Sequence, residues 1–141
     1  MTVTSEQIQL VRSSFALVAP QQSAAAALFY GRLFEIAPQL RALFKGDMDE
    51  QGRKLMMMFA TAVANLDRLD TIVPAVRALG ERHVGYGVTD ADYGAVAEAL
   101  LWTFATALGD AFTPATREAW TAVYVVLAGQ MQDAAHAAAK H

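Results

Sequence analysis

The segment GERHVGYGV, residues 80–88, places a histidine where a helix is expected to end, with glycines on either side of it. His83 stands alone in the interior of the sequence, since the other histidines, His136 and His141, belong to its last six residues. No histidine or acidic residue follows His83 at the third or fourth position, where a helix would bring a second metal ligand alongside it. The spacing therefore gives no support to a zinc or di-iron site.

The bulk composition is that of a folded protein without unusual partners. Of its 141 residues 55% are apolar and 18% charged, which predicts a single domain, residues 1–141, with one core. A net charge of −3 without a Lys/Arg cluster argues against nucleic-acid binding, and the lack of cysteine excludes disulfides and thiolate sites. With no signal-peptide pattern, and no apolar run near the ~20 residues of a membrane span, we expect a cytoplasmic protein without a membrane partner.

Apolar residues recur with helical spacing throughout, and no stretch alternates as a strand would. The pattern predicts an all-α fold of about six or seven helices with short connections. Caps and breakers set the expected bounds. The expected helices run from Thr4, capped with Gln7, to Pro20; from Pro20 to Ile36; briefly through Pro38–Phe44; from Asp49 to about Leu66; from Asp70, with Pro74 in the first turn, to a frayed end between Gly80 and Gly87; from Thr89, capped with Asp92, to Gly109; and onward from Pro114.

Two polar residues, Tyr30 and Gln51, head faces that are otherwise apolar. A buried polar group without a partner costs about 1–3 kcal/mol, so each needs a hydrogen bond. Either they bond to the protein or lie at its rim, or they point at a bound ligand, and periodicity leaves both readings open. His83 narrows the choice of ligand, because one protein side chain suffices only for haem iron, to which the porphyrin supplies four nitrogens.

The ordered set of these segments resembles single-domain bacterial globins related to the globin domain of flavohaemoglobins, including those of methanotrophs and thermophiles. The resemblance covers nearly the whole chain and implies a globin fold around a pocket for haem b. Its segments are FY at 29–30 with LF at 33–34, Pro38, LF at 43–44, QGRKL at 51–55, GERHVGYGV at 80–88, Tyr93, and AWTAVY at 119–124.

The resemblance also implies a role for each matching residue. His83 would be the proximal iron ligand, with its other ring nitrogen donating to a carbonyl one turn earlier, such as that of Leu79. Tyr30 and Gln51 would be distal hydrogen-bond donors that favour dioxygen over carbon monoxide. The remaining expected haem contacts are Phe44 and Val88 on the two porphyrin faces, Leu55 crowding the distal pocket, Tyr93 beside His83, and Lys54 and Arg53 either at the propionates or on a solvated face.

One departure from flavohaemoglobins concerns the proximal side. Those proteins couple the proximal histidine to a tyrosine, matched by Tyr93, and to a glutamate whose position here is Ala135. Asp133 is two residues earlier and out of phase. A less anionic proximal ligand favours stable oxygen binding over peroxidase-like cleavage.

The leading functional hypothesis is reversible dioxygen binding, as a carrier, store or buffer, with carbon monoxide and nitric oxide as further ligands. The alternative is nitric oxide dioxygenation, and this leaves open whether the protein is an enzyme. No dinucleotide fingerprint occurs, so that activity would need a separate reductase. A haem-free helical signalling module is the third hypothesis. Met58 and Phe59 are expected to face inward, Met56 to face outward or toward a neighbouring helix, and His136 and His141 to have no role.

Overall fold

The computed structural model describes residues 3–44, 46–85 and 89–139, the side chains of 84, 85, 138 and 139 excepted. Within these ranges the chain forms six α-helices and four short 3-10 turns and no strand, which confirms the all-α prediction. None of these helices combines the length and apolar character needed to cross a membrane. The elements are α1 Ser5–Val18, η1 Ala19–Gln21, α2 Gln22–Ile36, η2 Pro38–Leu43, α3 Met48–Ala64, η3 Leu66–Arg68, α4 Leu69–Gly85, α5 Asp90–Leu108, η4 Gly109–Ala111 and α6 Pro114–Ala139.

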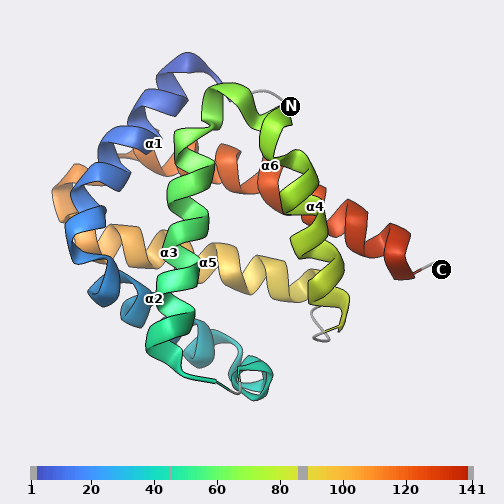
Figure 1. Cartoon of the computed structure of the whole chain (residues 1–141). Coiled ribbons are helices and arrows are strands. Elements are labelled where there is room, and N and C mark those ends of the chain that lie inside the picture. The colour runs from blue at the N-terminus through green and yellow to red at the C-terminus, as the bar shows by residue number, and fades with distance from the viewer. Residues whose placement is uncertain (1–2, 45, 86–88, 140–141) are drawn as a thin grey trace.

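The helices pack in crossed layers around one core. Figure 1 shows α3 crossing in front of α5, with α1 and α2 to one side and α4 to the other. Helix α6 packs against α1 and α4, and α2 packs against α3 and α5. Helices α3 and α4 therefore face each other across the front of the α5 and α6 layer.

Trp120 on α6 is the centre of the core. Its ring is 1% exposed and stacks on Phe104 of α5 at a centroid distance of 4.2 Å. The indole N–H donates to Ser14 Oγ at 2.8 Å, and Ser14 in turn donates to the carbonyl of Leu10 at 2.7 Å. A buried donor is thereby satisfied, and α1, α5 and α6 are joined at one point.

Two glycines permit the close helix contacts that position the front layer. A Cβ at Gly52 would lie 2.9 Å from the Cβ of Ala26, where α3 crosses α2. A Cβ at Gly80 would overlap the main-chain carbonyl of Met131, where α4 crosses α6. Because real Cβ atoms do not approach that closely, Gly80 is required for the placement of α4 and of the histidine it carries.

Three predicted helix starts are confirmed. Thr4 and Gln7 form a capping box, Asp92 accepts from the main chain of Thr89, and Thr113 accepts from the main chain of Thr116. Other bounds differ from the prediction. Helix α2 begins two residues after Pro20, which lies in η1, and Pro74 lies inside α4 and not in its first turn. Helix α4 extends to Gly85, within the predicted range from Gly80 to Gly87, and Gly80 marks a helix crossing.

The predicted inward face of α3 is wrong at Met58, which is 37% exposed. Met56, expected to face outward or toward a neighbouring helix, is 5% exposed, and Phe59 is buried as expected. The cause is the crossing at Gly52, which turns that residue toward α2. Met56 is four residues further on and so lies on the same face.

Candidate functional site

His83 lies near the end of α4, half-buried, with its ring held by the main chain of its own helix. Its Nδ1 donates to the carbonyl of Leu79 at 2.8 Å, which is the hydrogen bond predicted from the sequence. Burial lowers the pKa of His83, the Leu79 hydrogen bond opposes this, and the charge of Arg82 adds to the lowering. The ring is therefore neutral at neutral pH, with its proton on Nδ1 and a lone pair on Nε2.

Tyr93 of α5 forms the wall behind His83. The two rings stack at a centroid distance of 6.4 Å and an interplanar angle of 26°. The Tyr93 hydroxyl is buried and has no hydrogen-bond partner among the described residues. Its pKa is raised by burial, with a further contribution from Asp90. Such an orphaned hydroxyl is unusual in a folded protein and marks a position where a partner is missing.

Asp133, the acidic residue of α6 two positions before Ala135, does not supply that partner. Asp133 is largely exposed, and its carboxylate accepts from Arg77 of α4 at 2.6 Å. Gln130 accepts from the same arginine at 3.2 Å. Ala135, the position expected for a proximal glutamate, is half-buried and offers no polar group. The Asp133 carboxylate thus joins α4 to α6 at the surface and leaves the Tyr93 hydroxyl without a partner.

Tyr124 of α6, to which the sequence assigned no role, bonds to the main chain beside the His83 site. Its hydroxyl donates to the main-chain carbonyl of Tyr93 at 2.7 Å. Burial and the neighbouring Tyr93 raise the pKa of Tyr124 well above its usual range, so the hydroxyl stays protonated. The signal was present in the segment AWTAVY, since helical spacing places Tyr124 on the buried face of α6 four residues after Trp120.

A second cluster joins α2, η2 and α3. Gln51 Nε2 donates to the hydroxyl of Tyr30 at 3.3 Å. Phe44 meets the Tyr30 ring edge-on at 5.3 Å, and Phe34 stacks on it at 6.0 Å. Tyr30 is 7% exposed, and burial raises its pKa although the Gln51 hydrogen bond opposes the rise. The structure therefore brings Tyr30, Phe44 and Gln51 together, with a protonated hydroxyl among aromatic rings.

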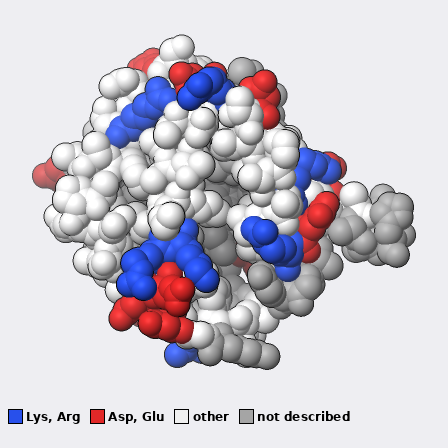
Figure 2. All heavy atoms as spheres, in the orientation of Figure 1, with Lys and Arg blue, Asp and Glu red and all other residues white. Residues whose placement is uncertain are grey.

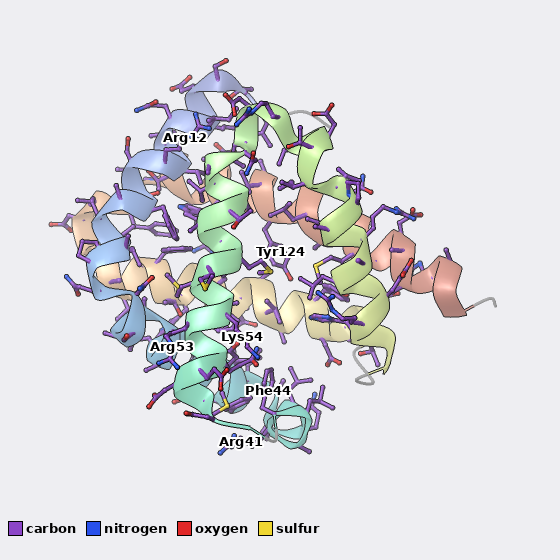
Figure 3. The ribbon with its side chains drawn as sticks, viewed as in Figure 1. Arg12, Arg41, Phe44, Arg53, Lys54 and Tyr124 are labelled. Atoms are coloured by element: carbon purple, nitrogen blue, oxygen red, sulfur yellow. The ribbon has the colours of Figure 1, made fainter. Side chains whose placement is uncertain are left out.

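The other residues of α3 that were predicted to contact haem follow Gln51 within about one helical turn. Leu55 is half-buried against the core. Figure 3 shows Lys54 on the side of α3 that faces α4 and Arg53 on the opposite side. Both cations are exposed, and Lys54 lies 4.0 Å from Glu50. Figure 2 shows this face of the molecule hollowed between α3 and α4, with charged side chains on both sides of the hollow.

Val88 and Gly87 fall outside the described residues, as does His141. His136, expected to have no role, lies at the surface with its Nε2 2.9 Å from the carboxylate of Asp90 at the start of α5. Helix α6 is long enough to reach that point. Within the described ranges, no group of three or more His, Cys, Asp or Glu residues could hold a metal ion.

The cluster around His83 and the cluster around Tyr30 lie on helices that flank the hollow between α3 and α4. The Globin family matches residues 27–131. The chain belongs to the globin family. This confirms the resemblance stated from the sequence, and the haem cofactor expected with it agrees with the same match.

Several relatives resemble this globin over most of its length. It is 30% identical to a flavohaemoprotein of Vibrio cholerae and 29% identical to one of Bacillus subtilis, over 89% and 88% of this chain. It spans only 33% and 32% of those two relatives, so their full activities do not transfer. A neuroglobin of Tetraodon nigroviridis is 27% identical over 92% of this chain and 90% of its own length.

Solved structures agree on the fold. An engineered carbene transferase from Rhodothermus marinus, also described as a candidate nitric oxide dioxygenase, matches with a TM-score of 0.85 at 28% identity. That match covers 96% of this chain and 94% of the other. A bacterial globin from Campylobacter jejuni matches with a TM-score of 0.85 over 98% and 100%, and its 24% identity supports the fold alone.

Proposed function

We propose that this globin holds one haem b between α3 and α4 and binds dioxygen reversibly, with His83 as the proximal ligand. When bound, the haem supplies an iron with one open position for a diatomic gas. The observation that carries the proposal is the Tyr30–Gln51 hydrogen bond inside the aromatic cluster, on the helix that faces the helix of His83. The orphaned hydroxyl of Tyr93 beside His83 further indicates a site that is complete only with a bound group.

On the proximal side, the chain prepares His83 in the form that a metal requires. The Leu79 carbonyl holds the proton on Nδ1 and thereby leaves Nε2 as the ligating nitrogen. The lowered pKa keeps the ring neutral, so a proton competes less with the iron. Stacking on Tyr93 restrains the ring plane.

On the distal side, the direction of the Tyr30–Gln51 hydrogen bond determines what the pair can do. Gln51 donates to the Tyr30 oxygen, so the hydroxyl hydrogen remains available for another acceptor. A diatomic ligand with partial negative charge is such an acceptor, and a preorganised donor stabilises it without reorganisation. Dioxygen acquires more negative charge than carbon monoxide, so the pair favours dioxygen.

The other proposed contacts rest on position or on the family resemblance. Phe44 would pack on the porphyrin from the Tyr30 side, and the contact proposed for Val88 on the opposite face rests on the resemblance alone. Lys54, on the side of α3 facing α4, is better placed for a propionate than Arg53 on the other side. A cytoplasmic location, where diatomic gases reach the protein by diffusion, completes the proposal.

Nitric oxide dioxygenation is the second candidate. In this reaction nitric oxide, dioxygen and one electron combine to give nitrate, so each turnover consumes an electron from a separate reductase. The observation that favours it is the similarity to the Rhodothermus marinus protein and to the globin part of flavohaemoproteins. The lack of a carboxylate at Ala135 favours simple oxygen binding instead.

The test is an absorption spectrum of the purified protein supplied with haem, in ferric, ferrous, carbon monoxide and air-equilibrated ferrous forms. A ferrous form that stays stable in air for minutes supports reversible oxygen binding. Rapid oxidation, together with many nitrate equivalents per haem when a reductase and nitric oxide are added, would favour the dioxygenase. Protein that takes up no haem would contradict both and leave a helical interaction module.

A further inference from the structure

Three consecutive methionines, Met56, Met57 and Met58, lie on three different sides of α3. Successive residues of an α-helix are turned by about 100° from one another, so each of the three meets its own surroundings. Met56 shares the side of Gly52, which meets α2, and is 5% exposed. Met57 shares the side of Arg53, away from α4, and is 68% exposed. Met58 is 37% exposed and lies neither in the core with Met56 nor on the outer side with Met57.

The surroundings of Met58 are the hollow between α3 and α4. Met58 follows Lys54 by four residues and Gln51 by seven, and both spacings bring side chains to one face of a helix. Figure 3 shows Lys54 on the side of α3 that faces α4. Within the described ranges, α3 packs mainly on α1 and α2, and α4 packs mainly on α6, so their facing sides border the hollow seen in Figure 2. Met58 therefore borders this hollow, two turns along α3 from Gln51.

A methionine at this position suits a flat aromatic group in the hollow. Seven residues of helix cover about 10 Å along the axis, so one porphyrin can span the distance from Gln51 to Met58. The unbranched thioether adapts to irregular surfaces and makes favourable contacts with aromatic rings. Leu55, three residues before Met58, is partly buried against the core. Together these side chains would form one wall of the haem site.

Oxidation of Met58 would change the polarity of this wall. When hydrogen peroxide oxidises a methionine, a bond forms between sulfur and one peroxide oxygen, the oxygen–oxygen bond breaks and water leaves. The sulfur thereby loses the two electrons that the peroxide gains. The sulfoxide is polar whereas the thioether is apolar, so oxidation weakens an apolar contact. A porphyrin in the hollow would shield Met58 from this reaction.

We propose that Met58 packs on the haem from α3, and that its oxidation by hydrogen peroxide in the haem-free chain weakens haem binding. The inference rests on the proposed haem site and adds to it a modification that controls haem uptake. Bound haem protects the residue on which its own binding depends. The neighbouring Met57 is oxidised with or without haem, and its oxidation has no effect on haem binding.

The first experiment measures which methionines a bound porphyrin protects. The purified full chain, haem-free or loaded with zinc protoporphyrin, is treated with hydrogen peroxide in the dark, and peptide mass spectrometry follows each sulfoxide. Zinc protoporphyrin has the shape of haem but no iron to react with peroxide. Loading should slow the oxidation of Met58 at least fivefold and that of Met57 less than twofold. Met56 should react slowly in both samples, because it is buried.

The absorbance of the same samples reports porphyrin uptake, which separates the two proposals. A loaded chain in which Met58 is not protected, or in which Met57 is protected as strongly, overturns the Met58 contact and leaves the haem site standing. A chain that binds neither zinc protoporphyrin nor haem overturns the proposed haem site, and this inference with it.

The second experiment measures the effect of oxidation on haem binding. Wild type and Met58→Leu are oxidised in the haem-free form, freed of peroxide and loaded with haem, and haem loss to excess serum albumin is recorded. Leucine keeps the contact apolar but forms no sulfoxide, while Met57 is still oxidised in both proteins. Oxidation should speed haem loss at least fivefold in the wild type and less than twofold in Met58→Leu. An equal effect in the two proteins overturns the role of Met58.

A matched pair of variants tests the same step without peroxide. Glutamine has nearly the length of methionine and imitates the polarity of the sulfoxide. Met58→Gln should lose haem at least fivefold faster than the wild type, and Met57→Gln at the wild-type rate. Both positions are exposed, so both variants are expected to fold, which circular dichroism checks. Equal haem loss from the two folded variants overturns the proposal.

Discussion

Gln51 on α3 donates a hydrogen bond to the hydroxyl of Tyr30 on α2, at 3.3 Å, within a ring of aromatic side chains. The amide satisfies the oxygen of the buried tyrosine and leaves its hydrogen available to another acceptor. The sequence left open whether Tyr30 and Gln51 bond to the protein or to a bound ligand. The pair is compatible with both, because the two residues bond to each other and the Tyr30 hydroxyl could still donate to the proposed ligand.

Replacing this donor should selectively weaken oxygen binding. In Tyr30→Phe the hydroxyl hydrogen is lost, and at about 1–2 kcal/mol for such a bond the oxygen dissociation rate should rise roughly tenfold. Carbon monoxide dissociation, measured on the same sample, should change much less, since that ligand carries less charge. Stopped-flow ligand replacement gives both rates. Equal changes for the two gases would show that the hydroxyl acts through pocket shape and not as a donor.

Restoring a carboxylate near Tyr93 should change the redox character of the site. In Ala135→Glu the new side chain can accept from the orphaned Tyr93 hydroxyl and make the proximal ligand more anionic. We expect a lower reduction potential and a several-fold gain in peroxidase turnover with a phenolic reductant. Ala137→Glu, which adds the same charge at an exposed position of α6, should leave both nearly unchanged. If the two variants behave alike, the added net charge and not a contact with Tyr93 causes the change in reduction potential and turnover.

Two glycine substitutions should change stability in opposite directions. Gly80→Ala forces α4 away from the Met131 carbonyl and should lower the free energy of unfolding by about 1–3 kcal/mol. Gly94→Ala adds a methyl group in open space and should raise it by about 0.5–1 kcal/mol, through helix propensity alone. Denaturant unfolding of the haem-free protein measures both. A stable Gly80→Ala variant would mean that the α4–α6 crossing adjusts at little cost.

Acid should destabilise the haem-free protein through His83. Burial lowers the folded pKa of His83 below its unfolded value of about 6.5, so the unfolded chain binds the proton first as the pH falls. The stability that His83 contributes is thus complete above pH ~6.5 and is lost as the pH falls through its folded pKa. Unfolding free energies between pH 8 and 5 should fall less steeply in His83→Gln than in the wild type. Parallel curves for the two proteins would exclude His83 as the titrating group.

Local signals in the sequence predicted the features that depend on neighbouring residues. The capping residues of α1, α5 and α6 were readable because a cap involves residues three positions apart. The hydrogen bond from His83 to Leu79 was readable for the same reason, since it spans one helical turn. The globin resemblance then placed Tyr30, Gln51 and Phe44 in one cluster, and the structure brings them together.

Features set by contacts between distant segments could not be read in this way. The inward position of Met56 depends on Gly52 meeting Ala26 of another helix, and no periodicity within α3 distinguishes it from Met58. The contact of His136 with Asp90 depends on the length and direction of α6. The role of Gly80 at the crossing of α4 and α6 could not be predicted, because the approach of Met131 leaves no trace in the sequence.

The central claim is that His83 ligates haem iron, and a haem titration tests it most directly. Wild type, His83→Ala and His136→Ala are titrated with haem, and the ferrous spectra are recorded at saturation. The proposed site predicts one haem per chain with a histidine-ligated ferrous spectrum in the wild type and in His136→Ala, and loss of that spectrum in His83→Ala. An unchanged spectrum and stoichiometry in folded His83→Ala protein would contradict the proposed site.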